Sequence, residues 1–133
     1  MITNMQQPQR LVAEKSTIEK GETQGTAIYI GPGADLRAVC FETEDGQVSF
    51  TGSQLTFLAS YDGTFWFSLN GYNGQPFTIS TKVLSTFKPT PNGLPSAGAV
   101  LPIQPGGLFA GVLAIIPVSD RPEAENRELL FYK

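Results

Sequence analysis

The chain contains no histidine and a single cysteine, Cys40. Without histidine it cannot form the Ser-His-Asp or Cys-His arrangements of many hydrolases, and it lacks the commonest zinc ligand. One cysteine can form neither an intrachain disulfide nor a thiolate zinc site. These absences predict that the chain is not an enzyme, has no catalytic residues and takes no metal or cofactor. Cys40 is interpreted as a small buried apolar residue.

Paired carboxylates could still support catalysis, because a pair of them can hydrolyse glycosides. The acidic clusters are Glu42-Thr43-Glu44-Asp45 and Glu123-Ala124-Glu125, and turn residues flank both of them. We interpret both clusters as solvated loops.

Charge is scarce as well. Charged residues make up 16% of the 133 residues, against about 25% in ordinary globular proteins, and the net charge is −3. The nine Lys and Arg residues are scattered, so we expect no nucleic-acid partner. The longest apolar run, Leu108–Val118, is shorter than the roughly 20 residues of a membrane span, so we expect no membrane partner. The first residues lack the apolar region of a secretory signal, which favours synthesis in a cytoplasm.

The charges that exist are unevenly distributed. Between Gly46 and Ser119 only Asp62, Lys82 and Lys88 are charged. Exposed strands normally carry Lys and Glu, which also keep sheet edges from pairing with other chains. A surface of Ser, Thr, Asn and Gln is easier to desolvate than a charged one. The middle of the chain is therefore predicted to pack against other subunits, and a polar sheet face that stays in solvent is the alternative.

Short runs of β-branched and aromatic residues alternate with glycine-containing turns such as Asp62-Gly63 and Asn73-Gly74. No segment shows apolar residues at helical spacing over three turns. This pattern predicts an all-β fold, an antiparallel β-sandwich for which a jelly roll is one candidate form. The expected strands are Thr26–Ile30, Asp35–Glu42, Gln47–Thr51, Gln54–Ser60, Thr64–Asn70, Gln75–Thr81, Ala97–Ile103, Leu108–Ile116 and Arg127–Tyr132.

The polar residues 1–26 favour an extended or partly disordered N-terminal arm, followed by a β-sandwich domain at residues 27–133. Within the sandwich, strand alternation assigns side chains to faces. Along the segment from 65 to 70 it places Trp66 on the polar face, opposite three apolar residues. The residues expected in the core are Phe65, Phe67, Leu69, Phe77, Ile79, Val112 and Leu113.

Three segments carry a family resemblance: FWFSLNGYNGQPFTI, LPIQPGGLFAGVLAII and RELLFYK. A strand ending in Asn-Gly, a Pro-Gly-Gly turn, an apolar strand containing glycine and a final C-terminal strand resemble small all-β accessory proteins of tailed-bacteriophage virions, including capsid decoration (cement) proteins. GVLAI followed by LLFYK is similar to the decoration proteins of lambda-like phages. The chain departs from that pattern in its length and in its additional N-terminal strands.

The resemblance implies a non-enzymatic virion structural protein, made in the host cytoplasm, that stabilises a shell. It further implies a homo-oligomer, with a trimer favoured, that binds a major capsid or other virion protein and uses its N-terminal arm. The residues expected at such interfaces are Leu11, Val12, Ile18, Trp66, Tyr72, Phe87, Leu94 and Leu108.

A lectin-like, carbohydrate-binding β-sandwich is the alternative function. Sugars bind to an aromatic face with Asn, Asp and Gln side chains around it. Residues of both kinds are close together in the sequence near the only tryptophan. The candidate sugar-binding residues are Tyr61, Asp62, Trp66, Asn70, Tyr72 and Asn73.

Overall fold

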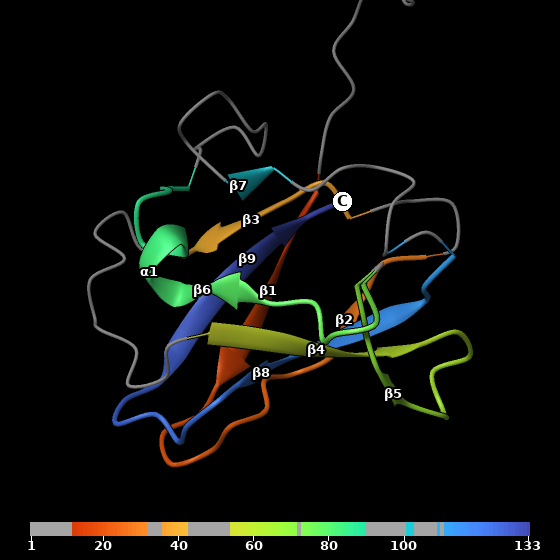
Figure 1. The fold of residues 1–133 in the computed structure, drawn as a ribbon. Helices are drawn as coiled ribbons and strands as arrows, with labels where there is room; N and C mark the ends of the chain where they lie inside the picture. The colour runs from red at the N-terminus through yellow and green to blue at the C-terminus, as the bar shows by residue number, and fades with distance from the viewer. Residues whose placement is uncertain are drawn as a thin grey trace, which may run out of the picture.

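The computed structural model describes residues 12–31, 36–42, 54–71, 73–89, 101–102, 109 and 111–133. These residues form short strands and one helical turn (Figure 1). The elements are β1 (Ala13–Ile18), β2 (Ile28–Tyr29), β3 (Ala38–Phe41), β4 (Gln54–Ser60), β5 (Phe67–Ser68), β6 (Ile79–Ser80), α1 (Thr81–Leu84), β7 (Leu101–Pro102), β8 (Ala114–Ser119) and β9 (Arg127–Tyr132).

The strands form two antiparallel sheets that pack face to face. Sheet A has the order β1-β9-β3-β7, and sheet B has the order β2-β8-β4-β5, with β6 also paired to β4. Because β5 and β6 occupy successive parts of the same edge of β4, they act as one interrupted strand. Figure 1 shows sheet B in front of sheet A.

The pairing scheme is that of a jelly roll. Among the described strands, with β5 and β6 counted together, the first pairs with the last (β1 with β9), and the second pairs with the last but one (β2 with β8). The third and fourth strands follow the same rule, since β3 pairs with β7 and β4 pairs with β5 and β6. A long antiparallel ribbon folded onto itself gives these pairs. The predicted fold class is confirmed.

Two of the expected strands, β4 and β9, have the predicted bounds. β8 lies further along the chain than expected, since it runs from Ala114 to Ser119. The strand expected at Gln47–Thr51 lies outside the described residues. The one described helix, α1, is a single turn, and the Ser80 Oγ accepts a hydrogen bond from the Val83 N–H at its start.

The boundary predicted at residue 26 is too late, because β1 is a strand of sheet A. All six of its residues are in register with β9, and the side chains of Ser16 and Ile18 are fully buried. The sequence pattern did not predict this strand, because only one of the two buried residues, Ile18, is apolar. The Ser16 hydroxyl is satisfied by donating to the Thr26 carbonyl oxygen at 2.7 Å. Residues 1–11 of the predicted arm lie outside the described part of the chain.

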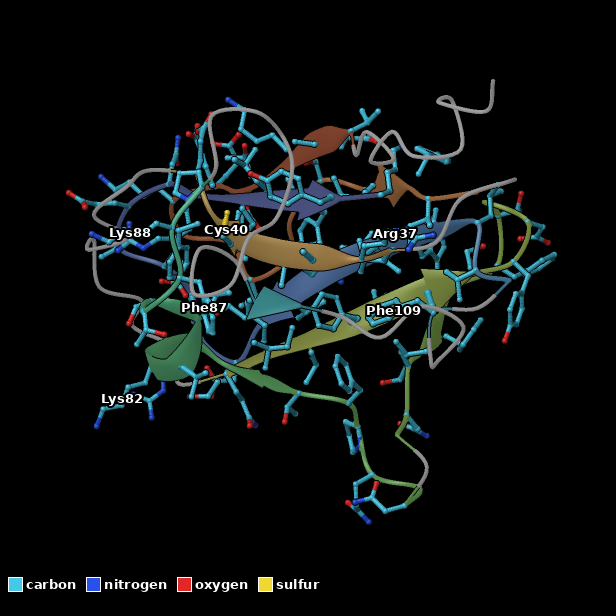
Figure 2. All side chains as sticks on the ribbon, turned by 90° about the horizontal axis from the view of Figure 1, so that it is seen from above. Arg37, Cys40, Lys82, Phe87, Lys88 and Phe109 are labelled. Atoms are coloured by element: carbon cyan, nitrogen blue, oxygen red, sulfur yellow. The ribbon has the colours of Figure 1, made fainter. Side chains whose placement is uncertain are left out.

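The core lies between the sheets and is centred on aromatic rings. Phe57 of sheet B is 6.2 Å from Phe131 of sheet A, measured between ring centroids, in an edge-to-face arrangement. Figure 2 shows Phe109 in the layer between β3 and β4, and its ring is 5.8 Å from that of Phe57. Phe77 completes the group, 5.6 Å from Phe109. One aromatic cluster therefore joins the two sheets.

The seven predicted core residues differ in how deeply they are buried. Leu69, Ile79 and Val112 are buried, as expected. Phe67 and Phe77 are partly buried against the core. The prediction is wrong for Phe65, whose side chain is 76% exposed, because β5 begins only at Phe67. The remaining prediction, Leu113, is half-buried.

The two sheets are joined along one side by the segment just before β2. The Gly25 N–H donates to the Pro117 carbonyl of β8, and the Thr26 N–H donates to the Thr17 carbonyl of β1. A Cβ on Gly25 would lie 2.6 Å from the Ser16 Oγ, which is closer than real contacts allow. A side chain at this position would displace the Ser16 and Pro117 side chains, so glycine fits best where this segment runs along the side of the two sheets.

Candidate functional site: the aromatic end

Exposed aromatic residues gather at one end of sheet B, where β2 and β4 end and β8 begins. The exposed fractions are 49% for Tyr29, 65% for Tyr61 and 76% for Phe65. These three residues, together with the half-buried Trp66, Phe67 and Leu113, are called the aromatic end below. Most large apolar side chains of a sandwich face its core, so this group is a candidate contact surface.

The turn from β4 to β5 presents Phe65 on a framework of side-chain hydrogen bonds. The Ser60 Oγ accepts from the N–H groups of Asp62 and Gly63, at 3.3 and 2.8 Å. The Asp62 Oδ1 accepts from the N–H groups of Thr64 and Phe65, at 2.8 and 2.9 Å, and from the Ser60 hydroxyl at 3.1 Å. The bonds from the Phe65 and Thr64 N–H groups hold the pKa of Asp62 below its usual range. The turn is thus ordered before any partner binds.

Contacts within the aromatic end hold its rings together. The rings of Tyr61 and Phe67 are 5.1 Å apart between centroids and tilted by 30°. Gly63, with φ of +81°, lies over Leu113 and Tyr29, since a Cβ there would be 3.6 and 4.0 Å from their side chains. The turn therefore packs on β2 and on the residue that precedes β8.

Few of the described side chains at this end are charged. The Lys133 ammonium contacts the Glu14 carboxylate and the backbone carbonyl of Tyr29, which ties sheet A to sheet B. Arg37 immediately precedes β3, and Figure 2 shows it at the end of β3 away from Cys40. Asp62 is exposed on the turn. Among the described side chains at this end, the Lys133–Glu14 pair is neutral as a unit, which leaves Asp62 and Arg37 as the other charged groups.

The predicted interface residues differ in how exposed they are in the structure. Val12 is 59% exposed and Trp66 is half-buried at the aromatic end. The prediction is wrong for Ile18, which is fully buried in the core of its own chain because it faces inward from β1. Phe87 is half-buried and packs against the small cluster of Ala38, Cys40 and Tyr132, which is separate from the main core cluster. The remaining four, Leu11, Tyr72, Leu94 and Leu108, lie outside the described residues.

The structure divides the predicted sugar-binding residues between two turns. Tyr61, Asp62 and Trp66 belong to the β4–β5 turn, whereas Asn70 and Asn73 belong to the hairpin between β5 and β6. Figure 2 shows this hairpin projecting beyond sheet B. The Asn73 Oδ1 accepts from the Gln75 N–H, so it shapes the hairpin tip. Tyr72, the sixth candidate, lies outside the described residues.

Several residues of the aromatic end were missed by sequence reasoning as functional candidates. Tyr29 and Phe65 are the most exposed of these residues. Arg37, a basic residue near the same end, was also given no role. The signal for Phe65 was present, since β4 was predicted to end at Ser60 and Asp62-Gly63 was identified as a turn. Starting the next strand at Thr64 placed Phe65 in the core.

Cys40 lies on the outer face of sheet A, and burial raises the pKa of its thiol to about 11. Its S–H faces the Tyr132 hydroxyl at 4.0 Å. A thiol in this environment is almost entirely protonated at neutral pH and is a poor nucleophile. The structural interpretation of Cys40 as a buried apolar residue is confirmed.

Two carboxylates meet further along the same face. The Lys15 ammonium lies 3.3 Å from a Glu42 oxygen and 3.9 Å from a Glu128 oxygen. The hydrogen bond and the negative charge of Glu42 raise the pKa of Glu128, and the hydrogen bond from Glu128 lowers the pKa of Glu42. Glu128 therefore takes up a proton first as the pH falls.

This pair predicts a small pH-dependent effect of Glu128→Gln. A raised folded-state pKa stabilises the fold below the unfolded pKa, and this contribution is lost as the pH rises through the folded pKa. Glutamine keeps a donor to Glu42 at every pH. We expect the free energy of unfolding of the variant to rise relative to that of the wild type as the pH increases from about 4 to about 7. The rise should be under about 1 kcal/mol, because both carboxylates are partly exposed. Urea unfolding at several pH values measures this, and a constant difference would contradict it.

Within the described residues, no group of three or more His, Cys, Asp or Glu side chains is arranged to hold a metal ion. In the same part of the chain, no helix is long and apolar enough to cross a membrane. Comparisons with protein-family models, curated proteins and solved structures found no match. The fold and the site together define a two-sheet jelly roll with an ordered, exposed aromatic end.

Proposed function

We propose that this chain is a non-enzymatic structural protein of a larger assembly, and specifically a capsid decoration protein of a virion. In this proposal it forms homo-oligomers and docks on other virion subunits. The observation that carries the proposal is the aromatic end, where Tyr29, Tyr61 and Phe65 are exposed on or beside an ordered turn that contains one charge. Aromatic anchors on preorganised loops dominate the binding energy of many protein interfaces.

Two further observations support an assembly role. The described surface near this end is poor in charge, so little charge must be desolvated on contact. Jelly rolls also occur in viral capsid proteins, which is an analogy at the level of the fold. The same fold occurs in lectins, so the choice between the two functions depends on the site. In the site, the candidate sugar ligands are split between two turns.

Phe65→Ala tests the proposal. We expect the wild type to have a molar mass in solution that is a multiple of 14.3 kDa. Removing an interface anchor costs about 2 kcal/mol or more, so the variant should associate at least about 30-fold more weakly. Its unfolding should be unchanged, because the side chain is 76% exposed. Light scattering behind a sizing column over a range of concentrations measures the association.

Val83→Ala is the matched control, because Val83 is also exposed, at 51%, but lies on α1. It should leave the association unchanged. A wild type that is monomeric at every concentration would argue against self-assembly. A panel of polysaccharides tests the carbohydrate alternative, with the fluorescence of Trp66, the only tryptophan, as the reporter. A saturable response to one glycan would favour the lectin-like function.

A further inference from the structure

We propose that the aromatic end binds the aromatic end of a second copy of this chain, with Asp62 of each copy facing Arg37 of the other. The inference rests on the proposed function and names the partner of the same surface. It is carried by the distribution of charge around the exposed rings.

Asp62 is fixed in position, and the described hydrogen bonds to its carboxylate reach only one of the two oxygens. The three hydrogen bonds that it accepts, from the Ser60 hydroxyl and from the N–H groups of Thr64 and Phe65, all end on Oδ1. The residue is exposed and no described residue donates a hydrogen bond to Oδ2, which leaves this oxygen for a donor from a second copy. The backbone of the turn fixes the orientation of the carboxylate, which lowers the entropy lost when a partner binds.

Arg37 is the complementary group. Its backbone N–H donates to the Tyr132 carbonyl at 2.8 Å, which fixes the backbone at the start of β3. Its guanidinium has no carboxylate partner among the described residues, whereas Lys133 at the same end is already paired with Glu14. The side chain is half-buried, so only part of its hydration would be lost on contact.

A second copy matches this pattern by symmetry. Asp62 follows β4 of sheet B, and Arg37 precedes β3 of sheet A. The Arg37 N–H donates to the Tyr132 carbonyl, and the next residue, Lys133, contacts Tyr29. Tyr29 lies beside Gly63 of the Asp62 turn, so both charges lie at the same end of the molecule. A two-fold axis through that end brings the acid of each copy toward the base of the other, as in an isologous interface. A partner surface that carried only positive or only negative charge would leave either Arg37 or Asp62 desolvated and unpaired, which is unfavourable. The charge pattern therefore favours a two-fold contact over the trimer expected from the sequence.

The experiment combines Arg37→Glu with Asp62→Asn. Arg37→Glu places acid against acid at both symmetric contacts, and we expect association at least about tenfold weaker. Asn keeps the oxygen that accepts the turn hydrogen bonds but removes the charge. Asp62→Asn added to Arg37→Glu should therefore restore part of the lost affinity, although Asp62→Asn alone weakens the wild type. Sedimentation equilibrium and light scattering measure the four dissociation constants.

Arg121→Glu is the matched control, because Arg121 is exposed in the β8–β9 connection at the opposite end of the sandwich. It should leave the association unchanged and show no rescue by Asp62→Asn. Cooperative urea unfolding checks that every variant is folded.

The outcomes separate the two proposals. If the wild type associates and Phe65→Ala dissociates it, but Arg37→Glu has no effect, the Asp62–Arg37 contact is overturned and the proposed function stands. The contact is likewise overturned if Asp62→Asn lowers the affinity of the Arg37→Glu variant further. A wild type that stays monomeric overturns the Asp62–Arg37 contact and the homo-oligomer of the proposed function.

Discussion

Glu123→Gln is expected to lower the free energy of unfolding by about 3 kcal/mol, because it removes a buried negative charge beside the buried Arg127 cation. Glu123 and Arg127 are 2% and 4% exposed. The Glu123 Oε2 lies 3.8 Å from the Arg127 Nε, and the Glu123 Oε1 accepts a hydrogen bond from the Ser119 hydroxyl at 2.6 Å. Glutamine retains the size of the side chain but loses the charge.

The backbone around Glu123 explains why this pair affects the whole fold. The Gly21 N–H donates to the Glu123 carbonyl, and the Glu123 N–H donates to the Glu22 carbonyl. These bonds join the β8–β9 connection to the β1–β2 turn, and Figure 1 shows the two segments side by side at one end of the sandwich. Loosening Glu123 would therefore disturb the N-terminal strand β1 as well.

Glu125→Gln provides the matched control, since Glu125 also contacts Arg127, at 3.6 Å, but its side chain is 67% exposed. Exposed ion pairs contribute about 0–1 kcal/mol, so this variant should stay close to the wild type. Urea denaturation at neutral pH compares the two, and the slope of the transition should be unchanged. Equal losses of unfolding free energy in both variants would show that the buried Glu123 contributes no more to stability than the exposed Glu125. Combining Glu123→Gln with Arg127→Met should cost less than the sum of the two single changes.

The sequence was most informative where apolar residues alternate between clear turn signals. β4 and β9 satisfy both conditions, and both have their predicted bounds. The density of glycine turns and the absence of helical spacing were sufficient for the fold class. β1 was missed because only Ile18 on its buried face is apolar, and the partner of Ser16 is ten residues away in sequence.

The errors at functional positions have a common physical origin. Glu123 was assigned to a solvated loop because a local pattern does not show that Arg127 and Ser119 cover it. Phe65 was assigned to the core because the strand alternation was applied to it, although it lies two residues before β5 begins at Phe67. Tertiary contacts decide both cases. The aromatic end itself depends on Tyr29 and Leu113, which are far from the β4–β5 turn in sequence.

Phe57→Ala is the other change with a large expected effect, a loss of about 3–5 kcal/mol in the free energy of unfolding. Phe57 is 1% exposed and has three aromatic neighbours: Phe77, Phe109 and Phe131, with ring centroids 5.9, 5.8 and 6.2 Å away. Truncation would leave a cavity at the point where sheet B contacts sheet A, and it would remove the edge-to-face contacts as well.

Phe65→Ala makes the same chemical change at a position that is 76% exposed, so it isolates the effect of burial. We expect its free energy of unfolding to stay within about 0.5 kcal/mol of the wild type, while Phe57→Ala unfolds at much lower urea. Phe57→Leu should fall between them, because leucine fills part of the cavity. If Phe65→Ala proved as destabilising as Phe57→Ala, Phe65 would belong to the core and its role as an interface anchor would fail. A stable Phe65→Ala chain that has lost self-association would assign Phe57 to folding and Phe65 to assembly.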